Sequence, residues 1–118
     1  MKIESESMRA AAGHATDLLK ALANPHRLLI ICQLLDGECS VGELAAFLGI
    51  RDSTVSQHLA LLRKDGLVSA RRDGQTIWYA ISSAPAREVL SALYRIYCGP
   101  KNKLQIKRRN TRTIDRDQ

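Results

Sequence analysis

The sequence predicts a mainly helical α+β protein in which four helices are followed by a β-hairpin and a final helix. Aliphatic residues recur at helical spacing along most of the chain. Residues that start or stop helices separate these stretches. The pattern then changes to two β-prone runs around Asp73-Gly74, which is a strong hairpin signal. Because a domain usually takes roughly 100–200 residues, 118 residues indicate a single domain.

Composition excludes several classes of protein. The longest apolar run, Leu28–Cys32, is far shorter than the roughly 20 residues of a membrane span, so we expect no membrane partner. The polar, acidic N-terminus does not resemble a signal peptide. The three cysteines follow no export signal, so we expect a cytoplasmic protein whose thiols are reduced.

The net charge of +6 is concentrated at one end of the chain. Residues 101–118 hold seven Lys and Arg against two Asp, which gives +5 and leaves +1 for residues 1–100. A basic balance suggests DNA first and an anionic membrane second, but the body is nearly neutral. We therefore expect a folded domain over 1–100 and, over 101–118, a basic tail without fixed structure. The tail is either a nonspecific phosphate contact or a solvated terminus.

The first two helices are predicted on either side of Asn24-Pro25. Residues 7–22 are rich in Ala and Leu at helical spacing. Asn24 suits an N-cap, and Pro25 suits the first helical position. The second helix should end near Leu35, before Asp36-Gly37. Its inward face is expected to consist of Leu28, Ile31, Cys32 and Leu35.

The third and fourth helices are short and lie close together in sequence. Ser40 and Glu43 form an S-x-x-E capping box that starts a helix over 41–48, and Gly49 ends it. The fourth helix is expected over 53–65, with Asp52 or Ser53 as its cap and Gly66 as its stop. The spacing of its apolar residues predicts one buried face, formed by Val55, Leu59 and Leu62.

The hairpin and the last helix follow. The runs 67–72 and 75–81 flank Asp73-Gly74, and a helix is expected over 84–98 before Gly99-Pro100. Two short helices with a Gly-containing turn, followed directly by a hairpin, are typical of a winged helix-turn-helix, with element order α-α-α-α-β-β-α.

The exposed side of the fourth helix suits the reading of double-stranded DNA. The major groove admits one helix, and side chains near its start reach the bases. Gln57 suits the recognition of adenine, because its amide can form hydrogen bonds to N6 and N7 of one adenine at the same time. Small hydroxyls suit phosphates or thymine methyl groups. The candidate DNA-binding residues on this helix are Ser53, Thr54, Ser56, Gln57, His58 and Arg63.

The hairpin would be the wing, with Arg71, Arg72 and Gln75 as candidate contacts to the DNA backbone or minor groove. Two simpler interpretations stay open. A polar helix face can be merely solvated, and winged helices also serve as protein-interaction modules.

Four segments together resemble the ArsR/SmtB family of bacterial repressors, over about residues 17–99. The resemblance implies a homodimer joined through the first and last helices. It also implies a pseudo-palindromic operator with half-sites about one helical turn apart. These segments are Ala23-Asn24-Pro25-His26-Arg27-Leu28-Leu29-Ile30, Ser53-Thr54-Val55-Ser56-Gln57-His58-Leu59, Gly66-Leu67-Val68 and Arg71-Arg72-Asp73-Gly74-Gln75-Thr76-Ile77-Trp78-Tyr79.

The common metal sites of that family look absent here. One branch has Cys-Val-Cys or Cys-Val-Gly at the start of the third helix, where this chain has Ser40-Val41-Gly42. Another places Asp, His, His and Glu on the last helix, where Glu88 is the single carboxylate. We therefore expect no metal and no cofactor. A metal- or metalloid-responsive repressor that uses the three cysteines, or one without an inducer, remains the alternative.

Cys32 and Cys98 resemble the cysteine pair of the sulfide- and persulfide-responsive, BigR/SqrR-like branch. That resemblance implies a redox switch, in which reduced thiols permit DNA binding and a bridge of two or more sulfurs releases it. By itself, Cys32 on an apolar helical face would be interpreted as a small core residue. Cys39 precedes a helix start, where a thiolate is favoured, but we expect it to be a bystander. No C-x-x-C or Cys/His/Asp set indicates a thiol enzyme.

Overall fold

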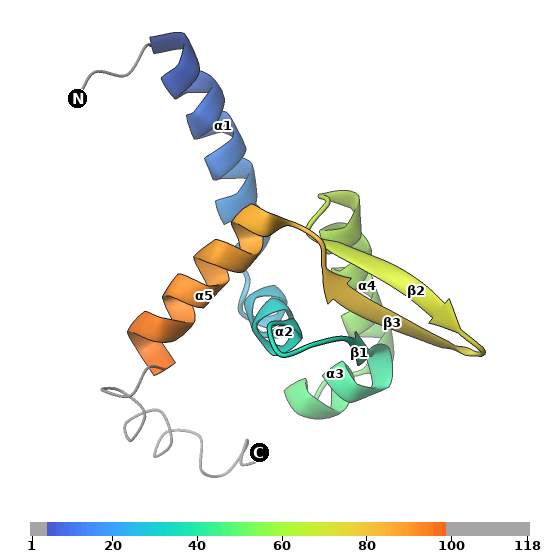
Figure 1. Cartoon of the computed structure of the whole chain (residues 1–118). Coiled ribbons are helices and arrows are strands. Elements are labelled where there is room, and N and C mark those ends of the chain that lie inside the picture. Colours follow the sequence, from blue (N-terminus) through green and yellow to red (C-terminus); the bar gives the residue numbers. More distant parts are fainter. Residues whose placement is uncertain (1–4, 99–118) are drawn as a thin grey trace.

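The computed structural model describes residues 5–98, which form five helices and a three-stranded antiparallel sheet (Figure 1). The predicted basic tail lies outside the described residues. Within 5–98, no helix is both long enough and apolar enough to cross a membrane. The elements are α1 (Ser5–Leu22), α2 (Pro25–Leu34), β1 (Cys39–Ser40), α3 (Val41–Leu48), α4 (Asp52–Lys64), β2 (Val68–Asp73), β3 (Thr76–Ile81) and α5 (Ala84–Cys98).

The predicted starts of α2 and α3 are confirmed by their hydrogen bonds. The Asn24 side chain accepts from the backbone N–H groups of His26 and Arg27, at 2.9 and 3.1 Å. At α3, the N–H of Glu43 donates to Ser40 Oγ at 3.2 Å, and the N–H of Ser40 donates to Glu43 Oε1 at 3.1 Å. Both arrangements satisfy backbone donors that a helix start leaves unpaired. The Asn24 cap fixes where α2 begins, and the Ser40 cap fixes where the chain enters the helix-turn-helix.

The predicted cap of α4 is wrong. The helix begins at Asp52, its N-cap residue is Arg51, and no side chain caps it. Asp52 instead lies in the first turn, where a carboxylate interacts favourably with the positive end of the helix dipole. Both Asp52 and Ser53 are exposed. The start of α4 is therefore free of local side-chain bonds.

The wing differs from the prediction at its turn. Asp73 pairs with Thr76, so the two turn residues are Gly74 and Gln75 rather than Asp73 and Gly74. Gly74 has φ +67, whereas no non-glycine described residue has a positive φ. A type II′ turn needs a positive φ only at its first central residue, which glycine adopts without steric cost. Gln75 consequently lies at the tip of the wing.

A third strand, β1, was not predicted. Its two residues, Cys39 and Ser40, pair with Tyr79 and Trp78, which makes β3 the central strand in the order β1-β3-β2. Two residues are too few to show the alternation that identifies a strand in a sequence. The strand joins the start of α3 to the middle of the wing.

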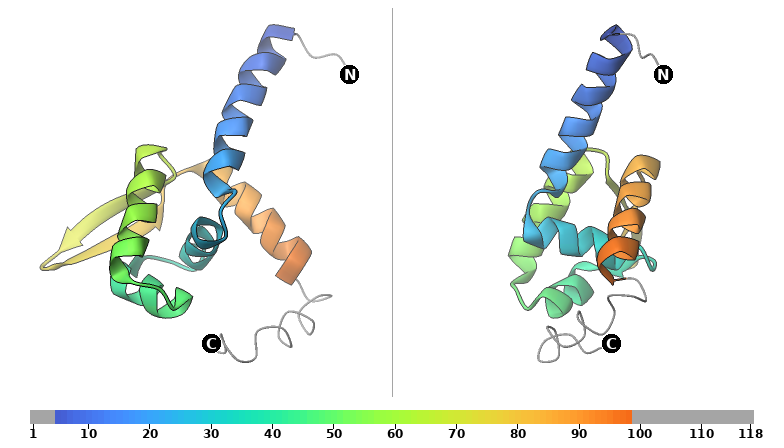
Figure 2. Two further views of the ribbon diagram at one scale, coloured as in Figure 1. Left: turned by 180° about the vertical axis from the view of Figure 1, so that it is seen from behind. Right: turned by 90° about the vertical axis from the view of Figure 1, so that its left-hand side faces the viewer.

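One aliphatic core joins all the elements, and α2 lies at its centre, between α4 and α5 (Figures 1 and 2). The predicted inward face of α2 is incomplete. Ile31 is buried and Leu28, Cys32 and Leu35 pack half-buried against the core, but the buried Ile30 and Leu34 were not predicted. Because other elements pack around α2 on several sides, its burial does not follow a single stripe.

The N-terminal part of α1 stands away from the rest of the protein in all views (Figures 1 and 2). Large apolar side chains on α1 and α5 are exposed. These two helices therefore form the least covered part of the described structure. The exposed apolar residues there are Met8, Leu19, Tyr94, Ile96 and Tyr97.

Candidate functional site

The helix-turn-helix consists of α3, the turn 49–51 and α4. Gly49 has φ +71, a left-handed conformation that glycine adopts readily and that reverses the chain after α3. Val55, Leu59 and Leu62 are buried, as predicted, and hold α4 on the core. The opposite side of α4 faces solvent near its start, where Ser53, Ser56 and Gln57 are exposed and Thr54 is half-buried.

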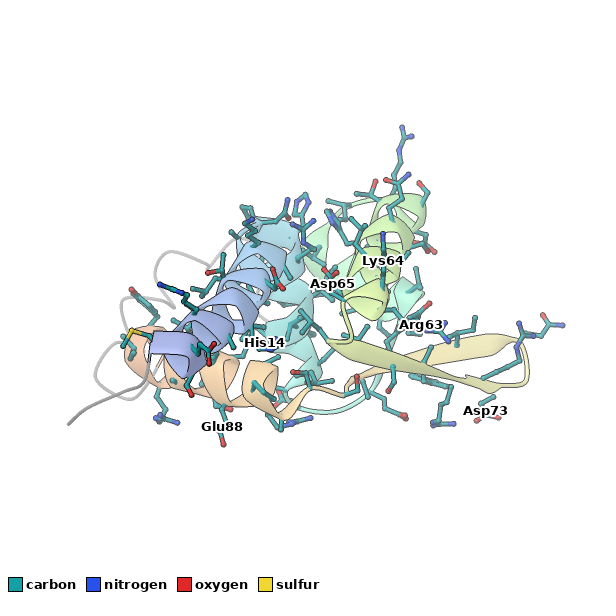
Figure 3. The ribbon with its side chains drawn as sticks, turned by 90° about the horizontal axis from the view of Figure 1, so that it is seen from above. His14, Arg63, Lys64, Asp65, Asp73 and Glu88 are labelled. Atoms are coloured by element: carbon teal, nitrogen blue, oxygen red, sulfur yellow. The ribbon has the colours of Figure 1, made fainter. Side chains whose placement is uncertain are left out.

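The other end of α4 is basic. Arg63 and Lys64 lie in its last turn, and both are exposed (Figure 3). Cations at a helix C-terminus interact favourably with the helix dipole, so these two residues also stabilise α4. Arg63 therefore lies on the candidate DNA-binding helix but at the end opposite to Ser53, nearly three turns away.

His58 lies apart from the exposed polar face. Its ring meets the ring of His26 of α2 edge to face, with 5.6 Å between centroids. Its Nδ1 is buried without a hydrogen-bond partner among the described residues. Burial lowers the pKa of His58, and the nearby Arg27 and His26 lower it further. His58 is thus suited to packing α4 against α2.

The wing presents Arg71, Arg72 and Gln75 to solvent. Arg71 is bound by Glu38, because its Nε donates to Glu38 Oε2 at 2.8 Å and its Nη2 to Oε1 at 2.7 Å. No sequence pattern predicts Glu38 as the partner of Arg71. Glu38 is 33 residues from Arg71, and its strand neighbours are too few to predict a pairing.

Cys32 and Cys98 are free thiols on neighbouring helices, α2 and α5, which contact each other. Burial raises the pKa of Cys32 to about 11, and the charge of an ionised Cys98 adds to this rise. Burial also raises the pKa of Cys98. With their pKa values raised, both thiols are protonated at neutral pH.

Cys39 does not favour the thiolate, which corrects the expectation from its place before α3. Burial raises its pKa first, followed by the charges of Glu43 and Asp36. Its Sγ donates a weak hydrogen bond to the carbonyl of Gly37 at 3.8 Å. Within residues 5–98, no group of three or more His, Cys, Asp or Glu side chains is placed to hold a metal ion.

Comparisons with known proteins agree with this architecture. Residues 24–70 match the family model described as "Bacterial regulatory protein, arsR family". The chain is 47% identical over 93 residues to the transcriptional activator HlyU of Vibrio cholerae, covering 79% of this chain and 86% of HlyU. It is 43% identical over 93 residues to the biofilm growth-associated repressor of Xylella fastidiosa, covering 79% and 82%.

Solved structures show the same fold. Reduced HlyU from Vibrio cholerae superposes with a TM-score of 0.76 at 47% identity, covering 79% of this chain and 98% of that chain. The repressor BigR from Xylella fastidiosa gives 0.74 at 42% identity, covering 81% and 98%. A homodimeric winged helix-turn-helix DNA-binding domain of Mb0332 from Mycobacterium bovis gives 0.67 at 31% identity, covering 81% and 89%.

The fold and the polar-faced α4 define a winged helix-turn-helix protein of the DNA-binding class. The chain belongs to the ArsR family, in the part that contains BigR-like regulators. It is a DNA-binding transcriptional regulator and not an enzyme.

Proposed function

We propose that the protein is a homodimeric repressor that leaves its operator when Cys32 and Cys98 become bridged. The observation that supports this most directly is the placement of the two thiols, each half-buried, on helices that contact each other. The relatives support the regulatory part, since one is named a repressor and one was solved in a reduced form.

The exposed apolar side chains on α1 and α5 support the dimer. Large apolar side chains that stay exposed are typical of protein interfaces when they gather on one surface. The Mb0332 domain, which shares the fold, is homodimeric. A dimer through α1 and α5 would present two copies of α4 to successive major grooves. Ser53, Thr54, Ser56 and Gln57 then contact the operator, with Arg63 and the wing beside them.

A low-molecular-weight persulfide, R–S–SH, is the proposed oxidant. One Cys thiolate attacks its outer sulfur, which gives Cys–S–SH and releases R–SH. The second thiol then attacks the inner sulfur of the protein persulfide, which forms Cys–S–S–Cys and releases H₂S. In total, the two thiols lose two protons and two electrons. The electrons cleave the S–S bond of R–S–SH, and the protons leave on R–SH and H₂S. A second persulfide would leave one more sulfur in the bridge and release one more R–SH.

The bridge would act on the DNA-binding helix through α2. Cys32 is on α2, which packs against both α4 and α5. Drawing the end of α5 against α2 would change the angle between the dimer surface and α4. Since both copies of α4 must fit one DNA duplex, a change in their spacing weakens binding to the operator.

The test is operator binding by the reduced protein before and after treatment with a persulfide. The probe is a duplex that the wild-type protein selects from a random-sequence library. Wild type should bind when reduced and release after treatment, with a bridged Cys32–Cys98 peptide found by mass spectrometry. Cys32→Ser and Cys98→Ser should bind equally well and fail to release.

Cys39→Ser is the matched control, and it should respond like wild type. Persistent release in Cys32→Ser would place the switch elsewhere. Release by Zn²⁺ or arsenite that needs Cys39 would instead favour the metal- or metalloid-responsive alternative.

A further inference from the structure

We infer that Glu38 is a positioning residue for the wing, and that the wing's contact with DNA phosphate comes from Arg72 rather than from Arg71. This inference rests on the proposed contact between the wing and DNA. It starts from the ion pair between Glu38 and Arg71, which lies outside the helix-turn-helix and which the cysteine switch does not use.

The geometry of the ion pair is bidentate. Two nitrogens of the Arg71 guanidinium, Nε and Nη2, each donate to a different oxygen of Glu38. Two parallel charge-assisted hydrogen bonds fix the orientation of both groups, unlike most surface ion pairs. Arg71 holds the pKa of Glu38 below its ordinary value, so the pair is charged at neutral pH.

The ion pair crosses the whole sheet. Ser40 of β1 and Arg71 of β2 are both register partners of Trp78 of β3, so the three residues form one row across the strands. Glu38 directly precedes β1. Its bond to Arg71 thus ties the short edge strand β1 to the edge strand β2 over the central strand. This brace fixes the middle of the wing relative to the residues that start α3.

Arg71 and Arg72 lie on opposite faces of the wing, because successive side chains in a strand alternate. Val68 and Ile81, which are register partners, belong to the same core cluster as Leu59 and Leu62 of α4. Residues 70 and 72 share the face of Val68, whereas Arg71 shares the face of Trp78. Arg72 therefore lies on the face of the sheet that packs toward α4.

Of the two wing arginines, Arg72 is the one on the face of the sheet toward α4. Its side chain makes no ion pair with another residue of 5–98. In the proposed complex, DNA that contacts the start of α4 would lie on that same side of the wing. Arg71 points to the other face, and its guanidinium is already hydrogen-bonded to Glu38. Asp73, near the far end of the wing in Figure 3, adds a carboxylate 3.9 Å from Arg71 Nη1.

The test is the salt dependence of DNA binding by the reduced full-length protein. The probe is the same selected duplex, so failure of the cysteine switch does not affect the result. Each phosphate contact contributes about 0.9 to the slope of log K against log salt. Arg72→Gln should therefore lower the slope by about 1.8 for a dimer. Glu38→Gln and Arg71→Gln should keep the slope and weaken binding roughly two- to tenfold.

The charge-swapped double variant, Glu38→Arg with Arg71→Glu, decides the role of the pair. It restores the brace but leaves a carboxylate at position 71, so it should bind within about twofold of wild type. The inference is overturned if Arg71→Gln lowers the slope, if Glu38→Gln strengthens binding, or if the swap binds worse than either single variant. An unchanged slope in Arg72→Gln overturns the role of Arg72.

Discussion

The chemistry of the proposed switch depends on two thiols with unequal surroundings. Cys32 is half-buried on the central helix, and both burial and the charge of Cys98 raise its pKa to about 11. For Cys98, burial alone raises the pKa. Because an ionised Cys98 disfavours the Cys32 thiolate, we expect Cys98 to be the first nucleophile and Cys32 to resolve the persulfide on it.

We expect bridging to accelerate with pH. A raised thiol pKa means that the thiolate is scarce at neutral pH, and its population grows about tenfold per pH unit below the pKa. The bridging rate of wild type should rise accordingly between about pH 6 and pH 8, as followed by mass spectrometry of quenched samples.

The order of attack gives a second measurement. In a Cys39→Ser background, Cys98 of the Cys32→Ser variant should take up persulfide sulfur faster than Cys32 of the Cys98→Ser variant. Faster modification of Cys32, or a rate that does not change with pH, would contradict this assignment of roles.

Among the elements, α4 has two sides with different tasks. Its inner side carries the predicted apolar residues and also His58, whose ring packs on His26. His58 lies three residues after Val55 and four before Leu62, so helical spacing places it beside the buried face, although its polar character suggests the exposed one. The side with Ser53, Ser56 and Gln57 remains the candidate for contacts with the operator.

Gln57→Ala should reduce discrimination between operator sequences. If the Gln57 amide bonds an adenine bidentately, its loss costs about 1–3 kcal/mol against that base and little against others. Binding to a panel of single-base operator variants measures this. Ser53→Ala is the control on the same helix, and a lost phosphate contact there should weaken all sequences alike. A binding profile of Gln57→Ala that matches wild type would exclude the reading role.

At the scale of the whole molecule, α1 and α5 lack the cover that the core gives to the other helices. Leu19 of α1 is 59% exposed and Tyr94 of α5 is 54% exposed. Burying such side chains in water-free contact stabilises an interface by about 25 cal/mol per Å² of apolar area. This is the physical reason for the proposed dimer surface.

Tyr94→Asp should shift the protein toward the monomer, because a carboxylate in an apolar interface loses its hydration. Sedimentation equilibrium would show a mass nearer 13.1 kDa than twice that value. Leu61→Asp is the matched control, since Leu61 is 49% exposed on α4, away from the proposed surface. Equal masses for wild type and Tyr94→Asp, or dissociation of Leu61→Asp, would reject α5 as the interface.

The sequence alone determined the order and type of all the longer elements and the caps of α2 and α3. These features rest on local physics, namely helical spacing, an Asn-Pro start and a capping box, which act within a few residues. It also predicted the exposed polar residues near the start of α4. Local patterns were less informative at the start of α4 and in the wing turn, where the strand register, rather than Asp73-Gly74, sets the turn residues.

The tertiary structure decided what depends on distant partners. Strand β1 exists because β3 pairs with it, and Glu38 meets Arg71 only through that sheet. The inward turn of His58 and the electrostatic interaction of Cys32 with Cys98 likewise require helices far apart in sequence to pack together. A sequence pattern indicates which residues can be buried or form hydrogen bonds. Which residues become their partners is determined by the packing of the elements in three dimensions.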